Sequence, residues 1–443
     1  MAALLEAARR RNPLPSGTAA VGVGLIIAGV SAYGFLFVAD KALSKTEYSP
    51  LGALWSLVFL VGPGLFLPLE QEISRALAER RARHQGGAPV FRRAATVGVG
   101  LGLGVLVLLI VSARWTVEHL FDQQLLLLVG LALGLAGALA GHLTRGSMSG
   151  SGHFKGYGTY LGADGFIRVL GALACLIIGV NTAGPFGVAV GLAGLLAVPV
   201  ALLVQRPQLE EGPEASLSEV GSALLLLLVA SLSAFALMNI GPVLVKLLAD
   251  ESQAEAAGRF VNGVVIARIP LFLFQAVQAS LLPKLSALAH SGQFGDFRAG
   301  LKRLMVAVTG LAFVGTLGGA FVGPFVVEVM FPQADLGART MGLLAAGAGL
   351  YMLALACAQA LIALGGHLDQ AVGWFLGLAA LLVTVMVASS DLFLRVEVAL
   401  LVGSAVSLTV MLGLLARRLA AAGPLQVESG DFIEALHEVA IEA

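Results

Sequence analysis

Three polar side chains, Arg268, Gln275 and Gln278, share one face of a mainly apolar stretch over residues 257–286. Their spacing follows the turn of an α-helix, so a helical stretch presents them on the same side. The stretch is long enough to cross a bilayer, because ~20 helical residues span the ~30 Å hydrocarbon core. Arg268 falls about eleven residues into the stretch, on the order of 16 Å deep. A charge at that depth costs about 2.5–3.5 kcal/mol to insert, so Arg268 requires a partner or a watery cavity.

Arg268 is a candidate anion-binding residue, because a guanidinium group holds a phosphate or carboxylate through two parallel hydrogen bonds. The alternative is a structural role, in which Pro270 kinks a packing helix and Arg268 pairs with a carboxylate of a neighbouring helix. The stretch contains no Asp or Glu of its own, which favours the anion site. We therefore predict that Arg268, Gln275 and Gln278 contribute to substrate binding.

Further candidates lie in other apolar stretches. Asp164 precedes Arg168 by four residues, the favourable order for an ion pair on a helix, so a structural salt bridge and a substrate site both stay open. We include Arg168 among the substrate-binding residues because it falls near the middle of its stretch. Asn239 and Lys246 share a helical face and are also binding candidates. Asp40 and Asp164 are the candidate carriers of a proton or a sodium ion.

Other polar residues are expected to have ordinary roles. Glu70 and Glu72 close an apolar stretch and are expected among cytoplasmic lipid headgroups, whereas His142 is expected to have an ordinary packing or interface role. The seven histidines are scattered, and neither an HExxH nor a CxxC motif occurs. The glycine-rich stretches do not complete a nucleotide-binding motif. We therefore expect no metal, no cofactor and no catalytic activity.

The composition indicates a membrane protein. Of the 443 residues, 58% are hydrophobic and only 12% are charged, whereas charged residues make up ~25% of a typical globular protein. The 56 glycines are typical of transmembrane helices that pack closely. The formal net charge is zero, which gives no indication of a nucleic-acid partner.

The apolar segments predict an all-α polytopic membrane protein, with twelve transmembrane helices in two six-helix bundles around a central cavity. The polar connections between the segments are mostly short. The predicted segments are roughly 17–40, 50–70, 94–113, 124–143, 157–180, 184–204, 219–248, 257–283, 303–331, 338–364, 370–390 and 396–416.

A stretch that contains Pro and Glu separates the two sets of segments. The expected domains are a cytoplasmic segment 1–16, a bundle 17–204, a linker 205–218, a bundle 219–418 and a cytoplasmic tail 419–443. Lys and Arg concentrate in the segments that lie inside when the N-terminus is inside. The positive-inside rule therefore predicts a multi-pass protein of the cell membrane with both termini in the cytoplasm.

Two groups of residues resemble the signature of polysaccharide-type flippases in the MOP superfamily, which are the O-antigen flippases and their Gram-positive and actinobacterial relatives. The first group runs from Arg268-Ile-Pro270-Leu271 through Gln275 to Leu281-Leu282-Pro283-Lys284-Leu285-Ser286. The second group contains Arg145-Gly146, Ser149-Gly150, Phe154, Tyr157, Asp164-Gly165 and Arg168. The six-plus-six layout expected here is similar to that of this family over the whole chain.

This resemblance implies alternating access, in which two bundles rock around a central cavity, with a polyprenyl-diphosphate-linked oligosaccharide as the cargo. Cationic residues of the cavity would hold the diphosphate while the lipid tail stays in the bilayer. The expected partners are this lipid-linked oligosaccharide, membrane lipids, and the glycosyltransferases or polymerase of the same pathway. The protein itself is expected to be a monomer.

Other functions stay open. A MATE-like drug/cation antiporter of the same superfamily would be expected to have acidic, aromatic cavity walls. A lipid II-type flippase would usually have two further C-terminal spans, and a membrane glycosyltransferase would need an acidic metal-binding motif and a large soluble loop. A non-transporting scaffold of cell-wall assembly is a different class again. Without a nucleotide site, transport would have to be driven by an ion gradient, the membrane potential or polymerisation of the product.

Overall fold

The computed structural model describes residues 18–216, 224–271, 291–332 and 334–421, together with Phe274, Leu285 and residues 287–289. Among these residues all regular elements are helices. Ten of the described helices are long and apolar enough to cross a membrane. The predicted all-α polytopic fold is thus confirmed.

The helices follow the predicted segments closely. The first half contains α2 (Thr18–Ala42), α3 (Lys45–Ala82), α4 (Ala88–His119), α5 (Leu125–Gly150), α6 (Phe154–Ile178) and α7 (Ala183–Val204). The second half contains α9 (Leu224–Asn239), α10 (Gly241–Leu248), the short 3-10 helix η1 (Glu251–Gln253), α11 (Ala256–Ala267), α13 (Phe294–Phe321), α14 (Gly323–Met330), α15 (Ala338–Ala363), α16 (His367–Val387) and α17 (Leu392–Ala421).

Two of the predicted spans are interrupted near Asn239 and Arg268, and a third, predicted over residues 303–331, is interrupted at Val322 between α13 and α14. The span predicted over residues 219–248 consists of α9 and α10, which are bent by 61° at Ile240. The span predicted over residues 257–283 begins with α11, which ends where Arg268 forms a turn. A proline closely follows each of the first two breaks, Pro242 after the first and Pro270 after the second. Because proline has no backbone N–H, neither of these two spans can carry a continuous ladder of helical hydrogen bonds.

The chain forms two compact units. Unit 1 comprises residues 1–47 and 65–224, and unit 2 comprises residues 48–64 and 225–443. Residues 48–64 of helix α3 therefore belong to unit 2, and the rest of the helix belongs to unit 1. This division differs from the bundles expected from chain order, in which all of α3 belongs with the first half.

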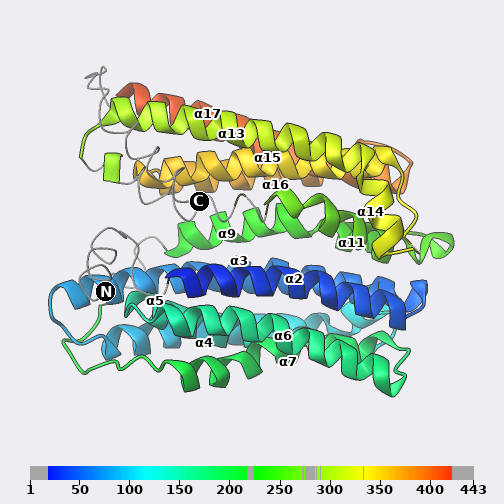
Figure 1. Ribbon diagram of the computed structural model, residues 1–443, viewed down its shortest axis with the longest axis horizontal. Coiled ribbons are helices and arrows are strands. Elements are labelled where there is room, and N and C mark those ends of the chain that lie inside the picture. The colour runs from blue at the N-terminus through cyan, green and yellow to red at the C-terminus, as the bar shows by residue number, and fades with distance from the viewer. Residues whose placement is uncertain are drawn as a thin grey trace, which may run out of the picture. The chain divides into compact units, whose positions relative to one another are not determined.

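Within unit 1, α2 lies along α6 and α5 lies along α7 (Figure 1). Small residues allow these close approaches. A Cβ atom added to Gly24 would overlap the carbonyl of Gly158, and one added to Gly158 would overlap the carbonyl of Ala20. In a membrane, such close backbone packing supplies the van der Waals contact that holds helices together.

The segment after α7 docks onto the turn between α3 and α4 in unit 1. Arg80 is only 4% exposed, and its guanidinium group donates to the carbonyls of Gly86, Pro213 and Glu214 at 3.0, 2.7 and 3.3 Å. The backbone N–H of Ala88 also donates to a carbonyl of this segment. Because one buried cation satisfies three backbone acceptors, the described part of the predicted linker 205–218 is an ordered segment fixed to unit 1.

Within unit 2, α15 lies along both α13 and α17, and α17 lies along α16 (Figure 1). The first part of α3 joins this unit through polar contacts. The Tyr48 hydroxyl donates to Asn262 Oδ1 at 2.7 Å in a buried position. Gly64 provides a second close contact, because a Cβ atom there would lie only 3.0 Å from the Leu232 side chain.

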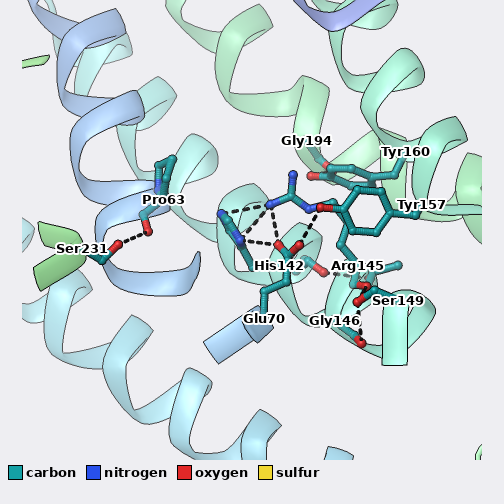
Figure 2. Close-up of polar contacts among 12 residues, drawn as sticks. Pro63, Glu70, His142, Arg145, Gly146, Ser149, Tyr157, Tyr160, Gly194 and Ser231 are labelled. Atoms are coloured by element: carbon teal, nitrogen blue, oxygen red, sulfur yellow. Dashed lines mark hydrogen bonds and ion pairs between the residues drawn. The ribbon is translucent and has the colours of Figure 1, made fainter. Parts of the chain in front are cut away.

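A proline in α3 explains a further polar contact of this helix, the one with Asn239. In a continuous helix the carbonyl of Phe59 would accept from the backbone N–H of residue 63, but Pro63 has none. Asn239 Nδ2 donates to that carbonyl at 3.2 Å instead. The hydroxyl of Ser231, also on α9, donates to the carbonyl of Pro63 at 3.3 Å (Figure 2). Helix α9 thus binds α3 where proline weakens the α3 backbone.

Candidate functional site

Arg268 lies in unit 2 at the point where α11 ends. Its guanidinium Nη1 donates to Asn239 Oδ1 at 3.1 Å, and Asn239 is the last residue of α9. The amide nitrogen of Asn239 donates to the carbonyls of Phe59 and Phe235 at 3.2 and 3.0 Å. Because both amide hydrogens are used, the amide oxygen is left to accept from Arg268, which fixes the orientation of the Asn239 side chain. The ends of two interrupted helices therefore meet through one hydrogen bond.

A pocket opens beside Arg268 within unit 2. Its empty volume is about 400 Å³, including space at the open mouth. Arg268, Tyr351 and Ser404 are the polar side chains of the described lining. The apolar part of the lining comes from α9, α11, α15, α17 and the residue after Pro270, and comprises Leu237, Met238, Val264, Ala267, Leu271, Leu344, Gly347, Ala348 and Leu400.

The pocket combines one cation with two hydroxyl groups on apolar walls. Arg268 is half-buried, whereas Tyr351 and Ser404 are buried. The charge of Arg268 acts on the hydroxyl of Tyr351, and the Tyr351 ring packs against Trp374 at 5.1 Å between centroids. These groups can donate hydrogen bonds to an anion, and the apolar walls strengthen that attraction by excluding water.

The other predicted binding residues are distributed over both units. Arg168 is 6% exposed on α6 in unit 1 and forms an ion pair of 2.5 Å with Asp164. Lys246 lies on α10. Because the bend at Ile240 interrupts the span, Asn239 and Lys246 do not lie on the continuous helical face that the sequence predicts. The binding roles of Arg168 and Lys246, and a cavity shared by Arg168 and Arg268, stay predictions.

The remaining predicted residues are Asp40, Gln275 and Gln278. Asp40 is buried on α2 in unit 1, and its role as an ion carrier stays a prediction. Gln275 and Gln278 lie outside the described residues.

The expectation for Glu70 is wrong, and His142, which is buried as expected of a packing residue, also takes part in a polar cluster. Glu70 does not lie among headgroups: it is 5% exposed, accepts from Arg145 and Tyr157, and lies within hydrogen-bond distance of His142 (Figure 2). Helix α3 continues twelve residues past Glu70 to Ala82, so Glu70 is not at a helix end. The i, i+3 spacing of His142 and Arg145 on α5 is the sequence signal that could have indicated a polar helix face.

Comparison with known proteins identifies the fold. No family model matches the chain. An uncharacterized protein of Mycobacterium bovis is 29% identical over 419 residues, which are 91% of this chain and 93% of that protein. An uncharacterized protein of Mycobacterium tuberculosis is 27% identical over 425 residues, which are 92% and 93% of the two chains.

Solved structures with the same fold are transporters. An inward-facing multidrug resistance MATE family transporter of the MOP superfamily matches with a TM-score of 0.71 and 12% identity, over 91% of this chain and 98% of that one. The MATE transporter VcmN of Vibrio cholerae in its bent form matches with a TM-score of 0.63 and 13% identity, over 91% and 96%. The chain therefore has the fold of MOP superfamily transporters.

Proposed function

We propose that this protein transports a polyprenyl-diphosphate-linked oligosaccharide across the cell membrane by alternating access. The observation that carries the proposal is the Arg268 pocket, in which a half-buried arginine shares an otherwise apolar lining with Tyr351 and Ser404. The fold shared with MOP superfamily transporters supports transport as the activity. The protein is proposed to act as a monomer with both termini in the cytoplasm, and to receive its cargo from glycosyltransferases or pass it to a polymerase.

The chemistry of a diphosphate matches this pocket. A diphosphate that crosses hydrocarbon needs fixed positive charge, and Arg presents that charge as a planar fork of donors. Asn239 holds the guanidinium group by one nitrogen at 3.1 Å. The hydroxyls of Tyr351 and Ser404 provide further donors in the same lining. Arg168 and Lys246 are proposed as additional cations along the path of the head group.

A drug/cation antiporter is the second candidate, because the structural neighbours include multidrug resistance transporters. A cationic drug is bound best by carboxylates and aromatic rings. Among the described residues that line the Arg268 pocket, none is acidic and one is charged, namely Arg268 itself. The pocket thus favours an anionic cargo. A lipid II-type flippase and a scaffold of cell-wall assembly are further alternatives that the same experiment separates.

Liposome transport measures the proposed activity directly. The full-length protein is reconstituted into liposomes that contain fluorescent polyprenyl-diphosphate oligosaccharide, and transport is read from the loss of quenching by a membrane-impermeant quencher. We expect transport by the wild-type protein and by Arg114→Ala, whose exposed side chain pairs with Glu118. We expect loss of transport in Arg268→Ala.

Parallel assays assign the alternatives. Efflux of cationic dyes without movement of any diphosphate lipid would replace the proposal with the antiporter. Movement of lipid II alone would identify a lipid II-type flippase. If the correctly folded protein moves neither cationic dyes nor diphosphate lipids, the function as a scaffold of cell-wall assembly remains.

A further inference from the structure

A second polar cluster lies inside unit 1, where α3, α5 and α6 come together (Figure 2). Glu70 Oε2 lies 2.7 Å from His142 Nδ1 and accepts from Arg145 Nη2, also at 2.7 Å. Glu70 Oε1 accepts from the Tyr157 hydroxyl at 2.8 Å. Glu70 and His142 are each 5% exposed. This cluster is separate from the Asp164–Arg168 pair and from the Arg268 pocket. The proposed function therefore does not use it.

The hydrogen bonds of His142 admit two arrangements of protons. Nδ1 lies 2.7 Å from Glu70 Oε2 and also 2.8 Å from Arg145 Nη2. A ring nitrogen carries either a hydrogen or a lone pair in its plane, so Nδ1 cannot donate to Glu70 and accept from Arg145 at once. When Nδ1 carries the hydrogen it donates to Glu70, and Nε2, 3.2 Å from Arg145, accepts from the arginine. When Nδ1 has the lone pair, a proton on Glu70 can occupy the shared contact.

The groups around Glu70 allow its carboxylate to bind a proton but not a metal ion. The guanidinium group of Arg145 already occupies one side of the carboxylate. The Tyr157 and Tyr160 rings flank that guanidinium group at 5.7 and 5.4 Å. A metal ion would have to displace this buried cation and would then find a single carboxylate, whereas hard cations require several oxygen ligands. A proton needs one oxygen only.

Besides α3, three helices contribute groups to this cluster. From α5 the cluster receives His142 and Arg145, and from α6 it receives Tyr157 and Tyr160. The carbonyl of Gly194 on α7 accepts from the Tyr160 hydroxyl at 3.4 Å.

Beyond this shell, Asp164 and Arg168 act electrostatically on Tyr160, but they are paired with each other at 2.5 Å. With His142 neutral, Glu70 and Arg145 therefore cancel. Any movement that withdraws Arg145 leaves a buried carboxylate, and protonation is the least costly way to neutralise it.

We propose that Glu70 is a proton-binding site, in which Arg145 and a proton compete for the same carboxylate oxygen and His142 passes the proton to and from it. On binding, the Arg145 contact to Oε2 breaks and an O–H bond forms with a proton that water delivers through His142. On release, the proton returns to water and the Arg145 contact re-forms. This site is separate from the cargo pocket and provides a transporter of this fold with a means of sensing or using a proton gradient.

Infrared spectroscopy of the full-length protein in nanodiscs, without cargo, tests the proposal. The spectrum at acidic pH minus that at neutral pH should contain the C=O band of a buried, protonated carboxyl group. The band should be absent in Glu70→Gln. It should persist in Glu79→Gln, an exposed carboxylate of the same helix that pairs with Arg83 at 2.6 Å.

Three further variants test the competition between Arg145 and the proton and the role of His142. Tyr157→Phe removes one donor to the carboxylate, so the band should appear about one pH unit higher. Arg145→Gln should move the band further in the same direction. His142→Gln should slow its appearance after a pH jump by at least about tenfold, because the exchanging group is gone.

These spectra test the proposed proton-binding site without any measurement of transport. A band that persists in Glu70→Gln assigns the proton to another carboxyl group and overturns the proposal. Tyr157→Phe keeps both buried charges in place, and so tests the site even where Glu70→Gln fails to accumulate. A band that appears at the wild-type pH in both Tyr157→Phe and Arg145→Gln would show that Glu70 is a structural anion. Because cargo is absent, none of these results depends on the proposed transport activity.

Discussion

Arg268→Gln separates the charge of Arg268 from its structural hydrogen bond. Glutamine keeps an uncharged N–H donor on the side of Asn239 Oδ1, in a side chain two bonds shorter than that of arginine. What is lost is the positive charge in the pocket. The variant should therefore fold and insert normally, and any defect should appear in binding of the anionic head group.

The expected size of that defect follows from the exposure of Arg268. It is half-buried, so its contacts to an anion are partly protected from water. A hydrogen bond to a charged group contributes about 1.5–3 kcal/mol. Since each 1.4 kcal/mol is a factor of ten, Arg268→Gln should weaken binding by roughly ten- to a hundredfold. Arg268→Lys should recover part of this loss, because it restores the charge without the planar fork.

Equilibrium binding of a short-chain fluorescent polyprenyl-diphosphate sugar to the protein in nanodiscs measures the effect. Arg114→Gln is the matched control, because it removes an exposed arginine of unit 1 that pairs with Glu118 at 2.8 Å. Its Kd should equal that of the wild type. A wild-type Kd for Arg268→Gln, with the protein correctly folded, would refute the assignment of Arg268 as the head-group cation.

Three further predictions concern folding, each measured by thermal unfolding of the full-length protein in detergent. Tyr48→Phe should destabilise unit 2 by about 1–3 kcal/mol, because Asn262 loses a buried donor at 2.7 Å; an unchanged unfolding temperature would contradict this. Gly158→Val should cost about 1–3 kcal/mol by forcing α2 from α6, whereas a stabilised variant would disprove that packing.

The third prediction concerns pH. The backbone N–H of Leu394 donates to Asp391 and lowers its pKa below the ordinary 3.8. The stabilisation is therefore present above about pH 4 and is lost as the pH falls through the lowered pKa. Asp391→Asn should lack this acid-induced step, and a step of the same size in the variant would assign it elsewhere.

The helical framework was predictable because hydropathy and helix periodicity are local properties. Nine of the predicted spans appear as single long helices in the described residues, and a tenth, predicted over residues 303–331, is divided between α13 and α14. The bend at Ile240 and the turn at Arg268 were only partly predictable. The prolines mark where the hydrogen-bond ladder weakens, but whether a helix kinks or breaks there depends on what its neighbours supply. Asn239 supplies such a contact by binding Arg268 across the two breaks.

The sequence alone determined which charged residues lie in apolar stretches, because hydropathy is read along the chain and a charge in such a stretch is costly enough to stand out. That reasoning identified Arg268 and the Asp164–Arg168 pair, whose spacing within one helix already sets their contact. It failed for Glu70, because the predicted span ended at residue 70 while α3 continues to Ala82.

Only the tertiary structure decided which polar groups meet across helices. Glu70, His142 and Tyr157 lie on three helices, and no spacing in the chain predicts that their side chains converge. The pairing of Asn239 with the carbonyl of Phe59 is of the same kind, since the acceptor is exposed by a proline in another helix. Inside a membrane every buried polar group must find a protein partner, and the rotation and packing of whole helices decide which partner it finds.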